Sequence, residues 1–416
     1  MQRKLLLFPL LLWYCMASGQ GNVPWVLTIE QAESSFIRKN ALLLAQHLNI
    51  NAARANEIQS SLYSNPVVTA EFAAYTGGNN KWLDVGRGGQ KAFAMDQLIS
   101  LAGKRQLLMK IAKSETREME ILYYDLLRTL RYELKSNFYR LAYATELIGK
   151  FDEQLDLLHK IIVAYDVQAA KRNVSLKDVV RLKTELIQLS ADRNSVVIES
   201  VEALQQLRIL FDTAATIQPL KPDMPIEILL VKDSLLSRAR QSRSDIQLLN
   251  IKVERDQLYH NYQRALRIPD LSLGVGYDQN SSYMPNYYSI RTGIELPVFN
   301  RNRGNIKAAK ARSEASLLIR DYKMRSLETE VVASLDKLNE AEKEYRMASD
   351  NFSSNFPEIN KAVVENFNRG NINILEFMDF FENYNAALRQ VNALQKQRRL
   401  AQVDLEFTVG TSIYNN

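Results

Sequence analysis

The sequence has little cysteine, glycine and proline, and it contains no apolar segment long enough to cross a membrane as a helix. One cysteine occurs among 416 residues, at Cys15 near the N-terminus, so disulfides and thiol chemistry are excluded for the rest of the chain. The 15 glycines and 10 prolines are clustered, which favours very long helices over several small domains. The histidines lie far apart and show no ligand spacing, so the sequence predicts no metal site: His47, His159 and His260.

The N-terminus has the pattern of a secretory signal. Arg3 and Lys4 precede the apolar run Leu5–Leu12, and small residues at 17–19 offer a cleavage site, so we predict a signal peptide over residues 1–19. Its removal takes two basic groups from a formal net charge of +6, and the remaining excess is too small and too evenly spread to indicate a nucleic-acid partner. If this exported chain enters a membrane, we expect it to do so with strands.

The rest of the chain is a tandem duplication. Residues 20–212 form a first repeat and residues 230–416 a second, with a proline-containing linker at 213–229. Pro66 and Pro269 stand in register, each after a helical segment and before a β-hairpin. A basic turn, a long helix, a break rich in glycine or asparagine and a closing helix then follow in both repeats.

The strand segments alternate between apolar and polar residues. In the second repeat, apolar residues recur at every other position in segments 271–277 and 288–296, in runs of about ten residues, as in outer-membrane strands. Segments 68–74 and 90–101 of the first repeat alternate less regularly. A hairpin of a soluble protein, with one solvent-exposed face, would give the same pattern. The membrane interpretation is favoured by aromatic residues near the loops, where an interfacial girdle would lie: Tyr75, Trp82, Tyr283, Tyr287 and Tyr288.

The helical segments are unusually long. Residues 106–170 carry apolar side chains at steps of three and four, close to the 3.5-residue period of a left-handed coiled coil, and would span roughly 100 Å. A similar helix is expected over 306–367, with a kink at Pro357. Four strands cannot close a barrel, and open edges are prohibitive in lipid, so several chains must pool their strands. Three chains would give twelve strands, and two chains remain an alternative.

The order of these elements resembles the TolC-like outer-membrane factors over essentially the whole mature chain. The resemblance rests on Leu98–Arg105, Leu296–Gly304 and Asn368–Phe377, and the form Leu-Pro-Val-Phe-Asn-Arg-Asn-Arg-Gly resembles the branch paired with heavy-metal and multidrug efflux pumps. It implies a mainly α fold with a membrane β-barrel: a homotrimer whose twelve-stranded barrel lies in the outer membrane, on a coiled-coil tunnel that crosses the periplasm.

The resemblance also implies a passive role in transport. The channel would join a periplasmic adaptor, or membrane fusion protein, and an inner-membrane pump, carrying small molecules or metal ions without a cofactor. No nucleophile-elbow or other catalytic pattern points to an enzyme. A type I protein-secretion channel is an alternative with the same fold. A soluble periplasmic coiled-coil scaffold, or the adaptor itself, is a rival of another class, although the duplication argues against an adaptor.

Candidate functional residues lie where the long helices break. Ser175 and Asp178 after the first break, and Asn373 and Glu376 after the second, have capping-box spacing. The resemblance places a closed constriction just past the second break, at Glu376 and Asp379, where copies from each chain would form an acidic ring. Capping alone is an alternative role for Glu376, and a solvated helix face is the alternative for Asp379.

The exposed ends of the two helix breaks are candidates for the surface that meets the adaptor. These tip residues are Val174, Leu176, Gly370 and Ile372. The alternative is that the two breaks only cover each other. The repeats also differ, because Arg181 occupies the position in the first repeat that Asp379 occupies in the second. We therefore expect any gate to lie in the second repeat.

Overall fold

A computed structural model describes most of the chain after the predicted signal peptide. The described residues are 24–76, 80–221, 230–281, 284–351 and 356–413, so the signal peptide, Cys15, Tyr283 and residues 222–229 of the predicted linker lie outside them. The chain divides into two compact units: unit 1 comprises Met1–Phe36 and Asn137–Pro222, and unit 2 comprises Ile37–Ser136 and Asp223–Asn416.

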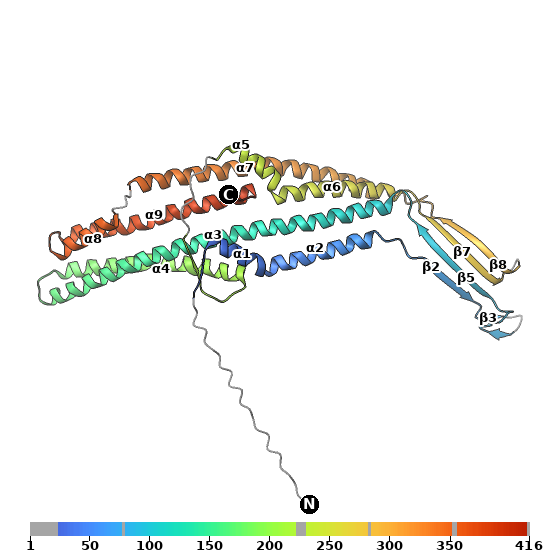
Figure 1. Cartoon of the computed structure of the whole chain (residues 1–416), viewed down its shortest axis with the longest axis horizontal. Helices are drawn as coiled ribbons and strands as arrows, with labels where there is room; N and C mark the ends of the chain where they lie inside the picture. Colours follow the sequence, from blue (N-terminus) through green and yellow to red (C-terminus); the bar gives the residue numbers. More distant parts are fainter. Residues whose placement is uncertain (1–23, 77–79, 222–229, 282–283, 352–355, 414–416) are drawn as a thin grey trace, which may run out of the picture. The chain divides into compact units, whose positions relative to one another are not determined.

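Unit 2 contains a four-stranded antiparallel sheet that unites the hairpins of both repeats (Figure 1). Its strands run in the order β2 (Val67–Phe72), β5 (Lys91–Ile99), β7 (Leu271–Asn280) and β8 (Pro285–Ile294). The central pairing, β5 with β7, joins the first repeat to the second. A small hairpin of β3 (Tyr75–Thr76) and β4 (Lys81–Trp82) follows β2. Within the described residues, β2 and β8 each pair on one side only, so the sheet has two open edges.

Helices lead into and out of this sheet (Figure 1). Helices α2 (Ala41–Ser60) and α6 (Ser244–Ala265) precede β2 and β7, and helices α3 (Lys104–Ala170) and α7 (Arg303–Asn351) follow β5 and β8. Unit 2 also contains α5 (Lys232–Ser242), α8 (Phe356–Asn368) and α9 (Ile374–Val409). The helix expected over 106–170 is present as the 67-residue α3. The second long helix is divided into α7 and α8, and residues 352–355 between them are outside the described part. No helix among the described residues meets the length and hydropathy of a membrane span.

Four helices of unit 2 share one apolar core. Buried side chains of α5, α6, α7 and α9 form a continuous cluster in which Leu327, Val331 and Leu405 are completely buried. The apolar residues on α7 recur at steps of three and four, so they form one stripe that faces the neighbouring helices. This core holds the C-terminal half of α9 against α5 and α7.

Unit 1 combines helices with a two-stranded parallel sheet. It contains most of α1 (Ile29–Lys39), the C-terminal part of α3, and α4 (Leu176–Phe211). Strand β1 (Trp25–Leu27) pairs in parallel with β6 (Ile217–Pro219), and the Trp25 ring packs edge-on against Phe211 at 5.4 Å. These strands were not predicted from the sequence, because three residues are too few to show a period of two. Strand β6 lies inside the segment that we predicted to be linker.

Candidate functional site

The four-stranded sheet has one apolar and one polar face. Residues that pair across strands lie on the same face, so Met95, Val275 and Ile290 form one apolar row. The Ile290 side chain is 85 % exposed, and most other apolar residues on this face are exposed to a smaller extent. The apolar face carries Val68, Ala70, Phe72, Phe93, Met95, Ile99, Leu271, Leu273, Val275, Tyr277, Tyr288, Ile290 and Ile294, together with the polar residues Lys91, Gln97 and Thr292. The polar face carries Thr69, Glu71, Asp96, Ser272, Gly274, Gly276, Asp278, Ser289, Arg291 and Gly293, together with the apolar residues Val67, Ala92, Ala94 and Leu98.

This division is the pattern of a strand between lipid and a water-filled lumen. Aromatic pairs lie near the loop end, with ring centroids 5.2 Å apart both for Tyr75 with Trp82 and for Tyr277 with Tyr288. Tyr287 departs from the expected girdle, because its pairing with Asp278 places it on the polar face. The alternation along the sequence already indicates this, since neighbouring residues on a strand point to opposite faces and Tyr288 is on the apolar face.

The first helix break turns at Arg172. Its φ of +63° is in the left-handed region, and the Asn173 N–H donates to the Gln168 carbonyl at 3.0 Å. Ser175 is the N-cap of helix α4, and its Oγ accepts a hydrogen bond from the Lys177 N–H at 3.2 Å. Asp178 lies near Tyr165, and burial together with this carboxylate raises the pKa of the Tyr165 hydroxyl.

The second helix break turns at Gly370, the position equivalent to Arg172. Its φ is +76°, a conformation that glycine adopts without the steric cost that arginine meets. Helix α9 begins with a complete capping box: Asn373 Oδ1 accepts from the N–H groups of Leu375 and Glu376, and Glu376 Oε2 accepts from the Asn373 N–H at 3.0 Å. The Glu376 carboxylate is therefore engaged at the helix end.

Asp379 lies one turn further along α9 and is exposed. The Asn383 amide donates to the Asp379 carbonyl at 2.8 Å and lies 3.4 Å from its carboxylate. The opposite side of the helix is buried: Phe377 and Phe381 are 0 % exposed, and Phe377 stacks on Phe367 of α8 at 4.2 Å. Aromatic packing thus orients this end of α9 so that its acidic residues face outward.

The four candidate tip residues differ in exposure. Leu176 is 73 % exposed, and Gly370 is exposed as well. Val174 and Ile372 are half-buried. Leu176 is therefore the largest apolar surface that these four residues offer to a partner.

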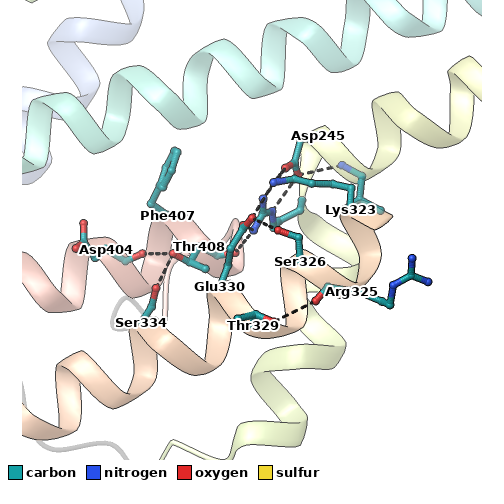
Figure 2. Close-up of polar contacts among 12 residues, drawn as sticks. Asp245, Lys323, Arg325, Ser326, Thr329, Glu330, Ser334, Asp404, Phe407 and Thr408 are labelled. Carbon is teal, nitrogen blue, oxygen red and sulfur yellow. Dashed lines mark hydrogen bonds and ion pairs between the residues drawn. The ribbon is translucent and has the colours of Figure 1, made fainter. Parts of the chain in front are cut away.

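A buried ionic network holds the other end of α9, and sequence reasoning missed it. Arg243, between α5 and α6, has a side chain only 5 % exposed. Its guanidinium donates to both carboxylate oxygens of Asp245, to Glu330 of α7 at 2.5 Å and to the Thr408 carbonyl of α9 at 3.4 Å. Figure 2 shows Asp245, Lys323, Glu330 and Thr408 converging at this point. The only feature of the sequence that could have indicated this network is the Arg-Ser-Asp segment at the start of α6, residues 243–245.

The charges in this network stabilise one another. Burial alone would raise the pKa of Glu330, but hydrogen bonds from Lys323 and Arg243 lower it to about 2. For the Asp245 carboxylate, burial is likewise outweighed by Arg243, and its pKa is lowered. Burial alone would lower the pKa of Arg243, but hydrogen bonds to both carboxylates raise it.

The last turn of α9 closes over Arg243. Gly410 has a φ of +83°, and a Cβ there would lie 3.1 Å from Arg243 Cγ and 3.3 Å from its Cα. One turn earlier, Glu406 binds Lys135 of α3 at 2.9 Å, with both side chains largely buried. Burial is outweighed there by the charge of Lys135, so the pKa of Glu406 is lowered. These contacts fix the C-terminal end of α9 to α3, α6 and α7.

Comparisons with known proteins agree with this geometry. Residues 235–411 match the family model described as outer membrane efflux protein. Solved structures share the fold. The Campylobacter jejuni CmeC outer membrane channel is 15 % identical in sequence and has a TM-score of 0.75, and the superposition covers 93 % of this chain and 86 % of the CmeC chain. Neisseria gonorrhoeae MtrE, in its open state, has 15 % identity and a TM-score of 0.72 over 92 % and 89 % of the two chains. A search of curated proteins by sequence finds no match.

The fold is therefore that of the outer-membrane efflux channels. The match of most of the second repeat to the outer membrane efflux protein family model confirms the resemblance predicted from the sequence. Within the described residues, no group of three or more histidines, cysteines or carboxylates is placed to hold a metal ion.

Proposed function

We propose that the protein is the outer-membrane channel of a tripartite efflux pump. The observation that carries the proposal is the four-stranded sheet with an apolar face, a polar face and two open edges. Such edges are prohibitive in lipid unless another chain pairs with them. Three copies pairing β8 of one with β2 of the next would close a twelve-stranded barrel, with the polar faces lining a conduit.

The channel would work as a passive conduit in the outer membrane, with a helical extension in the periplasm. An inner-membrane pump would supply the energy, and a periplasmic adaptor would meet the channel at the helix breaks. Leu176 and Gly370, flanked by Val174 and Ile372, are the residues that we assign to this contact. The account requires no cofactor, catalytic residue or nucleic acid.

We assign the closed constriction to Asp379, with Glu376 as its neighbour. Three Asp379 carboxylates around an axis would attract cations and hold the tip narrow by binding them. Glu376 has a second role as a cap, so its contribution to the conduit is smaller. Asp379→Ala should raise single-channel conductance several-fold, whereas Glu376→Gln, which keeps the side chain's acceptor oxygen, should change it little. Equal conductance of wild type and Asp379→Ala would contradict the assignment.

Fractionation and a deletion strain test the function. The protein should occur in the outer membrane as an oligomer that heat dissociates, and its deletion should lower tolerance to drugs or metal ions. A soluble periplasmic pool would contradict the proposal and favour a coiled-coil scaffold. Unchanged tolerance together with loss of a secreted polypeptide would favour a type I secretion channel.

A further inference from the structure

An ion pair on the polar face of the sheet joins two strands that are not neighbours. Asp96 of β5 and Arg291 of β8 both pair with Gly274 of the intervening strand β7. Arg291 Nη2 nevertheless lies 2.7 Å from Asp96 Oδ2. The two side chains therefore meet directly over Gly274, which is itself buried beneath them.

Glycine at position 274 makes this contact possible. Strands two places apart are about 10 Å from each other, a gap that aspartate and arginine side chains bridge only if no side chain stands between them. A Cβ at position 274 would lie 2.0 Å from Asp96 Oδ1 and 2.9 Å from its Cγ. The carboxylate thus occupies the space that any other residue at position 274 would fill.

The pair changes the charge that the polar face presents. The face carries three acidic residues, Glu71, Asp96 and Asp278, and one basic residue, Arg291. Asp278 accepts a hydrogen bond from Gln90 at 2.7 Å, and Glu71 is exposed. With Arg291 bound to Asp96 along the sheet, its guanidinium is drawn toward the wall and its charge is compensated.

We propose that Asp96 is a positioning residue that holds Arg291 flat against the wall of the conduit and so sets the ion preference of the barrel. The inference rests on the proposed function, because it requires the polar face to line a lumen. Without Asp96 or the gap at Gly274, Arg291 would extend into the lumen, where three copies would form a positive ring. Such a ring would attract anions, repel cations and narrow the conduit.

Planar-bilayer recordings of the purified oligomer in a KCl gradient test this inference. Gly274→Val separates the pair without changing any charge, and we expect it to lower the cation-to-anion permeability ratio at least two-fold. Gly293→Val is the matched control on the same face, since a Cβ there meets only Ser272 Cβ, at 3.7 Å, and it should keep the wild-type ratio. A wild-type ratio in Gly274→Val would overturn the proposal.

A charge exchange separates positioning from a structural role. The double variant Asp96→Arg with Arg291→Asp keeps both charges opposite Gly274, so it should restore the wild-type ratio, whereas Asp96→Asn alone should lower it more than Glu71→Gln does. Equal effects of Asp96→Asn and Glu71→Gln would show that only the number of acidic groups matters and would overturn the proposal. A wild-type oligomer that forms no channel would instead count against the proposed function.

Discussion

The two ends of helix α9 are held in different ways. At the C-terminal end, Arg243, Glu330 and Glu406 form largely buried ion pairs that tie the helix to α3, α6 and α7. At the N-terminal end, the exposed acids have a cap and an amide for partners, and aromatic stacking supplies the packing. Among the described residues, the amide of Asn385, in this same half, is buried and neither of its polar atoms has a partner.

This contrast indicates which end can move. A buried unpaired amide costs about 1–3 kcal/mol, so the present position of the N-terminal half is less favourable than its packing alone suggests. In the C-terminal half, by contrast, the buried charged side chains have ion-pair partners, which stabilise the present position of that half. A conduit gated by α9 would then open by displacement of the helix near Asp379, with the end near Arg243 as the fixed point.

Removing the fixed point should have the largest effect on stability. Arg243→Ala removes the buried cation of the network and leaves Asp245 and Glu330 with only Lys323 as a basic partner, so we expect it to lower the free energy of unfolding by about 3 kcal/mol. Urea denaturation followed by circular dichroism measures this change. Arg240→Ala is the matched control, because Arg240 and its partner Glu328 are each about half exposed, at 48 % and 49 %. Arg240→Ala should lower the free energy of unfolding by less than about 1 kcal/mol. Equal losses for the two variants would contradict the role of the network.

Low pH should reduce the stabilisation that the ionic network gives to the C-terminal end of α9. The pKa of Glu330 falls from 4.5 to about 2 on folding, so its stabilisation is present above pH 4.5 and is lost as the pH falls toward 2. Because the side chain is 35 % exposed, solvent screening reduces the effect to about 1–2 kcal/mol. The melting temperature should drop between pH 5 and pH 2.5 more steeply for wild type than for Glu330→Gln. Parallel pH profiles for the two proteins would contradict this prediction.

The smallest effect on stability is expected at the N-terminal end of α9. Asn373→Ala removes the oxygen that accepts from Leu375 and Glu376, at a cost of about 1 kcal/mol. Asn373→Ser keeps an acceptor and should behave like wild type. Hydrogen exchange at the first turn of α9 is the suitable measurement, because the loss is local. Protection that is unchanged in Asn373→Ala would show that packing alone holds this turn.

Periodic features were predictable from the sequence, whereas contacts between distant segments were not. Alternation at 271–277 gave β7 and its faces, and the coiled-coil spacing over 106–170 gave α3, because both signals repeat along the chain. Strands β1 and β6 were missed because three residues show no period. Arg243 and Glu330 are 87 residues apart, and nothing local distinguishes them from solvated charges. The alternation at 271–277 places Gly274 on the polar face but does not reveal its contact with Asp96, since that contact depends on the β5–β7 register.

The most direct test of the account uses a thiol at position 379. The mature chain has no cysteine if the signal peptide is removed, so Asp379→Cys supplies its single thiol. We predict that oxidation of the purified oligomer links the introduced thiols of neighbouring copies and lowers channel conductance, and that a reducing agent restores it. An equivalent thiol at Glu328→Cys, near the fixed end of α9, should leave conductance unchanged. Complete labelling of the introduced thiols in Asp379→Cys without links between copies, at constant conductance, would contradict the claim that α9 narrows the conduit at its N-terminal end.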